Sequence, residues 1–94
     1  MPREATIVRA IRTALLREPG VWFVKYSPGD YGTAGVPDLL ICYRGRFVGM
    51  EVKQPGQRPT KIQQHTLDAI AMAGGIAIVA TSADEALECL RGIP

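Results

Sequence analysis

The spacing of apolar residues near the start of the chain predicts an amphipathic helix over residues 4–17. Apolar positions recur every three or four residues and arginines occupy positions between them, so one stripe of this helix is expected to be buried. Pro19 and Gly20 follow at once and end the helix. The expected buried stripe consists of Ile7, Ala10, Ile11, Ala14 and Leu15.

The rest of the chain predicts four strands and two further helices. Short β-branched and aromatic runs place the strands at residues 21–26, 38–43, 47–53 and 76–80, and the helices are expected at 60–73 and 83–90. Thr60 with Gln63 has the pattern of a capping box, and Thr81 or Ser82 can cap the last helix. The order α-β-β-β-α-β-α predicts an α/β fold with a mixed central sheet flanked by helices and a parallel crossover into the last strand. A chain of 94 residues buries one core, so residues 1–94 are expected to form a single domain.

The turn between the second and third strands determines which side chains face each other. A tight turn at Gly45, which supplies a positive φ, sets a register in which Asp38 lies opposite Glu51. Lys53 lies two residues beyond Glu51 and therefore projects from the same face of the sheet. The opposite face collects apolar side chains alone: Leu39, Ile41, Val48, Met50 and Val52.

Directly opposed carboxylates repel each other, so Asp38 and Glu51 need a cation between them. Lys53 can neutralise one of the two. A hard divalent cation such as Mg²⁺, held by carboxylate oxygens, a carbonyl and water, would neutralise both. Geometry alone also allows a surface ion-pair cluster of the three residues that carries no chemistry.

The charge of the chain is unevenly distributed, although its net value is only +2. Residues 1–20 carry a net +2, residues 21–65 a net +3 and residues 66–94 a net −3. A basic middle beside an acidic end is typical of a face that binds a polyanion, although a chance distribution of surface charges explains it equally well.

Three features predict a cytoplasmic protein without a membrane partner. Cys42 and Cys89 lie in apolar surroundings without metal-binding spacing, so they are expected to be buried thiols in a reducing compartment. The longest apolar run, residues 69–80, is too short and too interrupted by glycine to span a bilayer. The first residues are charged and contain no apolar segment of the kind that signal peptides carry.

Three short motifs follow one another along the predicted elements. They are Gly35-x-Pro37-Asp38, then Glu51-x-Lys53 followed by Pro55 and Gly56, then Thr60-x-x-Gln63. The first two resemble the signature of the PD-(D/E)xK nuclease superfamily, and the whole series resembles a stand-alone VRR-NUC domain of the viral or bacterial type. The resemblance covers nearly the whole chain. It implies a restriction-endonuclease-like core and action in the cytoplasm of a bacterium or a virus-infected host cell.

The resemblance also implies a DNA endonuclease that uses Mg²⁺ or Mn²⁺, needs no organic cofactor and leaves 5′-phosphate ends. Asp38, Glu51 and the backbone carbonyl of Val52 would hold the metal. Lys53 would orient or activate the attacking water, or pair with the phosphate. The further residues that it implies are Glu4 and Gln63 in catalysis, and Lys25, Ser27, Arg58 and Lys61 in nucleic-acid binding.

Some of these residues have simpler explanations. Glu4 complements the dipole of the first helix, Gln63 completes a capping box, and Lys25 is one more exposed lysine. His65 is a lone histidine and is expected to be a solvated side chain rather than a catalytic group.

The short chain limits the substrates that a nuclease of this kind can select. It has no separate target-recognition domain and no long insertion for reading bases, so we expect selection of branched DNA such as a flap or a Holliday junction. A four-way junction is nearly two-fold symmetric, which favours a homodimer with two sites. The alternatives are a nucleic-acid-binding module with the same fold and no hydrolysis, and a structural or adaptor protein.

Overall fold

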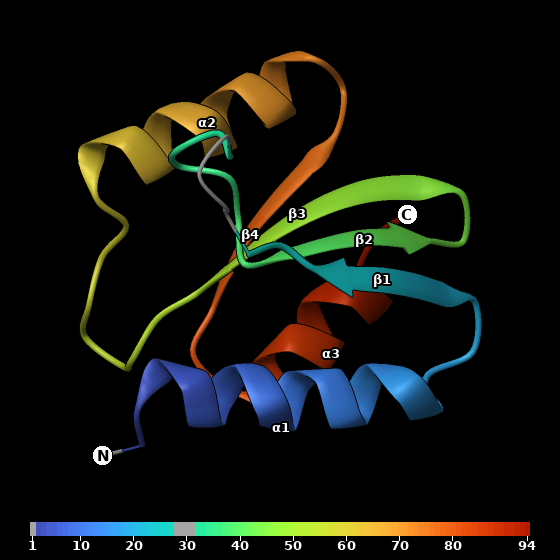
Figure 1. Cartoon of the computed structure of the whole chain (residues 1–94). Helices are drawn as coiled ribbons and strands as arrows, with labels where there is room; N and C mark the ends of the chain where they lie inside the picture. Colours follow the sequence, from blue (N-terminus) through green and yellow to red (C-terminus); the bar gives the residue numbers. More distant parts are fainter. Residues whose placement is uncertain (1, 28–31) are drawn as a thin grey trace.

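A four-stranded mixed sheet lies between two layers of helices in the computed structural model, which describes residues 2–27 and 32–94 (Figure 1). The strands lie in the order β1-β2-β3-β4, so the two edges of the sheet are β1 and β4. The elements are α1 (Glu4–Arg17), β1 (Val21–Lys25), β2 (Leu39–Tyr43), β3 (Arg46–Val52), α2 (Lys61–Met72), β4 (Ile76–Ala80) and α3 (Ala83–Arg91). The predicted order of elements and the mixed sheet are therefore confirmed.

The β2–β3 hairpin has the predicted register. Arg44 and Gly45 both have positive φ, at 48° and 85°, which is the pattern of a type I′ turn and matches the twist of the strands that it joins. Tyr43 pairs with Arg46 across the turn, and the ladder continues to the pair of Leu39 and Met50. The strand β4 pairs with β3 in parallel, as the intervening helix predicts.

One face of the sheet, which we call the core face, packs against α1 and α3 (Figure 1). All five apolar side chains predicted for this face are buried: Leu39, Ile41, Val48, Met50 and Val52. Full burial of such a side chain contributes roughly 1.5–3 kcal/mol, so the alternation along β2 and β3 strongly favours this register over a slip by one residue.

The buried stripe of α1 differs from the prediction at three positions. Ile7, Ile11 and Leu15 are buried as expected, but Val8 is buried with them, Ala14 is only half-buried and Ala10 is exposed. Val8 belongs to the same core cluster as Ile7, Ile11 and Leu15, so the buried stripe includes the side of the helix that carries Val8.

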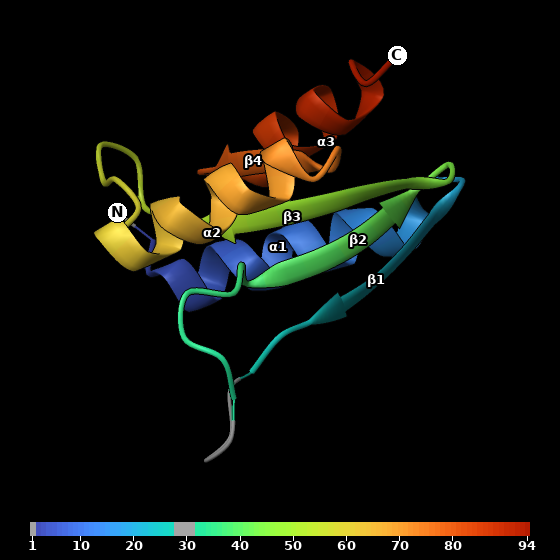
Figure 2. The ribbon, with the colours of Figure 1, turned by 90° about the horizontal axis from the view of Figure 1, so that it is seen from above.

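The other face of the sheet, which we call the open face, is covered only in part. Seen from above, α2 crosses β3 and β4 and leaves β2 and β1 without a helix over them (Figure 2). Trp22 on β1 is 65% exposed and Phe47 on β3 is 48% exposed. Both pair with Cys42, so the three side chains form one row across the open face.

The prediction that both cysteines are buried is wrong, because Cys42 and Cys89 are exposed free thiols. Cys42 lies on the part of the open face that α2 does not cover, and Cys89 lies on the outer side of α3. None of the helices within residues 2–27 and 32–94 has the length and apolar character needed to cross a bilayer.

Candidate active site

Asp38 lies directly before β2, where two hydrogen bonds hold it. Its backbone carbonyl accepts a hydrogen bond from the Tyr26 amide at 2.8 Å. Its carboxylate oxygen Oδ2 accepts one from the Val52 amide at 2.9 Å. The carboxylate of Asp38 is therefore fixed against the end of β3.

Glu51 is buried on β3, one residue before Val52, and its side chain is only 1% exposed. Burial raises the pKa of the Glu51 carboxyl to about 8, and hydrogen bonding to Asp38 and the negative charge of Asp38 add to the rise. The positive charge of Lys53 acts in the opposite direction. At neutral pH the fold thus keeps Glu51 mostly protonated beside Asp38.

One oxygen of this carboxyl group lacks a hydrogen-bond partner. Oε2 of Glu51 is buried, and nothing in the described part of the chain pairs with it. A buried polar oxygen without a partner costs about 1–3 kcal/mol, and native proteins rarely retain one without a use. The carboxyl to which it belongs lies near Asp38, which is where the sequence places a cation.

Lys53 follows β3 and is 8% exposed, which is unusual for a lysine. Its backbone amide donates to the Ala80 carbonyl on β4 at 3.1 Å, whereas the amide of Val52 points to Asp38 on the β2 side. In an extended strand the amide and carbonyl of one residue point to the same side, so the Val52 carbonyl also points to the Asp38 side. Asp38, Glu51 and Lys53 therefore lie together on one face of the sheet, as predicted, with the Val52 carbonyl beside them.

The donor set fits a hard divalent cation that keeps several water ligands. Two carboxylates and one carbonyl offer oxygen ligands, which Mg²⁺ and Mn²⁺ prefer, and the unpaired Oε2 of Glu51 supplies a ligand atom without a competing partner. Within residues 2–27 and 32–94, no three or more His, Cys, Asp or Glu side chains lie together as a metal site. A cation here would therefore complete its shell with water and a bound phosphate.

The other two predicted catalytic residues lie on helices and not on the sheet. Glu4 is an exposed residue at the start of α1. That end of α1 lies beside the segment after β3, because the Gln54 side chain donates to the Pro2 carbonyl at 2.8 Å. Gln63 forms the predicted capping box with Thr60. The side-chain Oε1 of Gln63 accepts a hydrogen bond from the Thr60 backbone amide at 2.9 Å, and the backbone amide of Gln63 donates one to the Thr60 hydroxyl at 3.3 Å.

The residues predicted to bind nucleic acid are exposed. The ammonium group of Lys25 donates to the Ser27 hydroxyl at 3.0 Å, at the end of β1. Arg58 lies in the loop before α2, and Lys61 is the first residue of α2. His65 is exposed on α2, as predicted. Of the loop that joins β1 to β2, residues 28–31 lie outside the described residues.

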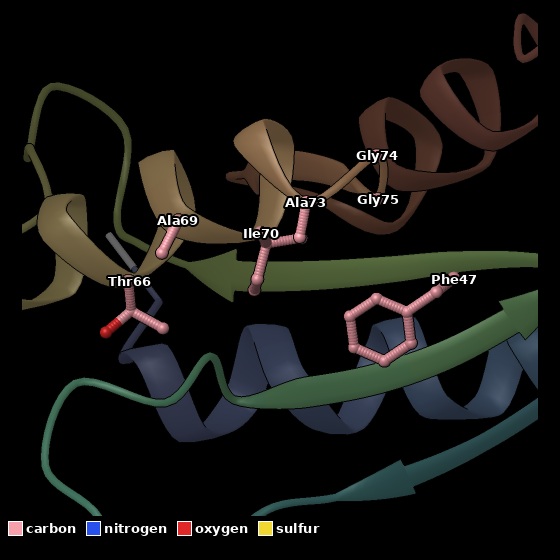
Figure 3. Close-up of a pocket in the computed structure, with 7 residues that line it drawn as sticks. All are labelled: Phe47, Thr66, Ala69, Ile70, Ala73, Gly74 and Gly75. Atoms are coloured by element: carbon pink, nitrogen blue, oxygen red, sulfur yellow. The ribbon is translucent and has the colours of Figure 1, made fainter.

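A shallow apolar groove of about 440 Å³ lies on the open face beside the C-terminal half of α2 (Figure 3). Its lining consists of Phe47, Thr66, Ala69, Ile70, Ala73, Gly74 and Gly75. It contains none of the acidic residues or Lys53, so the candidate chemistry is not located in this groove.

Sequence reasoning missed one residue that shapes the site, Gly49 in the middle of β3. A glycine inside a strand that otherwise carries large apolar residues indicates a close approach by another part of the chain. In the structure, Pro37 and Ile70 both approach Gly49. The sequence contains the signal, but only the fold identifies the approaching residues.

No family model matches this sequence, and no curated protein matches it. Two solved structures resemble it closely in fold. A structure described as "VRR_NUC domain" has a TM-score of 0.79 and 22% sequence identity, and the match covers 97% of each chain. A structure described as "VRR_NUC domain protein" has a TM-score of 0.75 and 21% identity, over 96% of this chain and 86% of the other.

The fold is therefore that of VRR_NUC domain structures, an α-β-β-β-α-β-α core with a mixed sheet. The fold expected from the sequence motifs is confirmed over nearly the whole chain. At these identities the likeness concerns the fold, and the assignment of chemistry rests on the residues of this chain.

Proposed function

We propose that this protein is a metal-dependent endonuclease that hydrolyses DNA phosphodiester bonds. The observation that carries the proposal is the buried carboxyl of Glu51. Its Oε2 has no partner among the described residues, and the negative charge of Asp38 is near enough to raise the pKa of this carboxyl. A protein that only needed a stable sheet would gain stability from an apolar residue at this position. A bound divalent cation explains why both acids stand there.

Asp38, Glu51 and the Val52 carbonyl are the proposed ligands of Mg²⁺ or Mn²⁺. When bound, such a cation neutralises the charge that develops on the scissile phosphate and lowers the pKa of a coordinated water. Asp38 is already oriented for ligation by the Val52 amide, which leaves its second carboxylate oxygen for a further contact. Glu51 becomes a ligand when it loses its proton.

Lys53 is proposed to orient the attacking water or to pair with the phosphate. Its ammonium group carries three donors and is largely screened from solvent. Its positive charge is near enough to Glu51 to act on the pKa of that carboxyl. Glu4 and Gln63 are proposed to support the site through water or the substrate. Oε1 of Gln63 is used by the capping box, so the side-chain NH₂ group of Gln63 would serve this role.

The DNA backbone is proposed to contact Lys25, Ser27, Arg58 and Lys61. Exposed cations around a site of this kind attract phosphates without reading sequence. Contacts to phosphates favour selection by DNA shape over selection by base sequence, so we propose branched substrates such as flaps and Holliday junctions, cut to leave 5′-phosphate ends. Exposed free thiols fit a reducing cytoplasm.

A homodimer is proposed to present two sites to such a junction. The open face offers an uncharged row of Trp22, Cys42 and Phe47, and an uncharged surface can meet its own copy without like-charge repulsion. Exposed aromatic side chains of this kind are enriched in protein interfaces.

The test is a set of labelled DNAs incubated with Mg²⁺ or Mn²⁺: single strands, duplex, flap and four-way junction. We expect wild-type protein to cut the branched DNAs best. Asp38→Ala, Glu51→Ala and Lys53→Ala should each remove cleavage while the circular dichroism spectrum stays that of the folded protein. Cutting that persists in a chelator and in the Asp38 variant would refute the proposal. Salt-dependent binding without any cutting would favour the non-catalytic nucleic-acid-binding module instead.

A further inference from the structure

Three glycines allow α2 and the loop before β2 to pack closely against the sheet. A Cβ atom added at Gly35 would lie 2.8 Å from the Ile62 carbonyl oxygen, and one added at Gly75 would lie 2.8 Å from Cγ2 of Ile70. A Cβ added at Gly49 would lie 2.7 Å from Cδ1 of Ile70 and 3.1 Å from Cγ of Pro37. Real Cβ atoms do not occur at the shortest of these distances, so any other residue at these positions would force a neighbouring atom to move.

Gly49 differs from the other two because it contacts the residue that precedes Asp38. Ile70 points from α2 toward β3 (Figure 3), and the fully buried ring of Pro37 lies over the same glycine. Ile70 and Pro37 thus meet over the one position of β3 that has no side chain. A larger residue at position 49 can displace the flexible end of Ile70, but the ring of Pro37 moves only with its backbone.

The position of Asp38 is sensitive to such a movement. Its carbonyl is bonded to the Tyr26 amide at 2.8 Å and its carboxylate to the Val52 amide at 2.9 Å. A shift of the backbone at Pro37 is passed to the next residue, Asp38, and changes the length and angle of these two bonds. Displacements near 1 Å at a catalytic group reduce rates by up to about a hundredfold.

We propose that Gly49 is a positioning residue for the candidate active site, because its missing side chain lets Pro37 pack on β3 and so orients the Asp38 carboxylate toward Val52 and Glu51. The catalytic consequence rests on the proposed function. The orientation itself does not, and it can be measured in the metal-free protein.

The amide of Val52 is a direct reporter of this orientation. The ladder between β2 and β3 ends at the pair of Leu39 and Met50, so the Val52 amide is bonded to the Asp38 side chain and not to a strand backbone. The next amide, that of Lys53, is bonded to the Ala80 carbonyl on the opposite side of β3. It serves as an internal control on the same strand.

The experiment measures hydrogen exchange of these two amides by NMR in Gly49→Ala and in the matched variant Gly75→Ala, which contacts the other end of Ile70. We expect Gly49→Ala to speed exchange at Val52 by about tenfold while Lys53 changes little. Gly75→Ala should lower the melting temperature without this selective effect at Val52. Equal exchange at Val52 in both variants and in wild type would overturn the proposal.

Two further variants keep the test decisive if Gly49→Ala folds poorly. Gly49→Ala combined with Ile70→Val removes the Cδ1 atom that a new Cβ meets first, so it should restore the melting temperature but not the slow exchange at Val52. Pro37→Ala removes the ring without adding a clash and should also speed exchange at Val52. If neither variant moves the Val52 amide, Gly49 has no positioning role.

Activity assays separate this proposal from the proposed function. If wild-type protein cuts DNA, Gly49→Ala with Ile70→Val should lower kcat by about tenfold or more and leave KM for DNA nearly unchanged. An unchanged kcat would overturn the catalytic consequence. If wild-type protein does not cut at all, the proposed function fails, whereas the exchange at Val52 still decides the role of Gly49.

Discussion

Glu51 has an unusual environment for a carboxyl group on a short strand. Its side chain is buried, it stands next to a second acid, and one of its oxygens has no partner within the described residues. Burial and the neighbouring Asp38 disfavour the charged form and raise the pKa of Glu51 to about 8. In the absence of a metal, the residue therefore destabilises the fold whenever the pH is high enough to ionise it.

This pKa has a consequence for stability that can be measured. Between the usual value of 4.5 and the folded value of about 8, the folded protein holds a proton that the unfolded chain has lost. The free energy of unfolding of metal-free protein should therefore fall by about 2–4 kcal/mol as the pH rises through this range. Urea unfolding at several pH values measures it.

Glu51→Gln is the matched variant, because glutamine has nearly the same shape as glutamate and its side chain does not ionise. Its free energy of unfolding should lack this fall and exceed that of wild type above pH 8. Parallel stability curves for wild type and Glu51→Gln would contradict the raised pKa.

Asp38→Asn separates the charge of Asp38 from its structural bond. The asparagine oxygen still accepts a hydrogen bond from the Val52 amide. The metal-free variant should therefore fold and be at least as stable as wild type. One ligand charge is lost, so cleavage should fall by about a hundredfold or more. Gel assays of DNA cleavage and thermal melts measure both, and a variant that cuts like wild type would exclude Asp38 as a ligand.

At the scale of elements, α2 covers β3 and β4 and begins at a capping box that Gln63 shares with Thr60. The sequence predicts this box from residue spacing alone. It also predicts the hairpin register, because a two-residue turn leaves few alternatives and alternation along the strands excludes a slip. It does not predict which segment packs on Gly49, because that contact joins a loop, a strand and a helix that are distant in the chain.

Gln63→Glu tests whether the side-chain amide of Gln63 contributes beyond the cap. Glutamate at this position also completes a capping box, so the free energy of unfolding should change by no more than about 0.5 kcal/mol. Loss of the amide donor should still reduce cleavage severalfold.

Thr60→Ala is the control, since it removes the cap from the same helix turn. It should cost about 1 kcal/mol of stability and leave cleavage nearly unchanged. If Gln63→Glu cuts as well as wild type, then Gln63 serves the helix alone.

At the scale of the whole molecule, the two faces of the sheet are covered unequally. The core face is sealed by α1 and α3, whereas the open face is covered only over β3 and β4 (Figure 2). The sequence predicts helices around the sheet but not how far each one reaches. The predicted burial of Cys42 is wrong for this reason, and the thiol is exposed.

The proposed homodimer can be tested through the exposed aromatic side chains of the open face. If a second copy binds over Trp22 and Phe47, light scattering should give twice the mass of one chain, and Trp22→Arg should give a monomer because it places a charge in the interface. Leu16→Arg is the matched control, since Leu16 is 78% exposed on α1 away from this face. A wild-type monomer at micromolar concentration, or loss of the dimer in both variants alike, would contradict an interface on the open face.

The most direct test of the central claim is calorimetric titration of Mn²⁺ into the metal-free protein in buffers of different ionisation enthalpy. If Asp38 and Glu51 hold the cation together, binding should release nearly one proton per metal at pH 7, because the pKa of Glu51 is about 8, and little at high pH. Asp38→Asn and Glu51→Gln should each weaken binding by at least about tenfold. Binding that releases no proton and is equally tight in both variants, or no binding by the folded wild-type protein, would contradict the account.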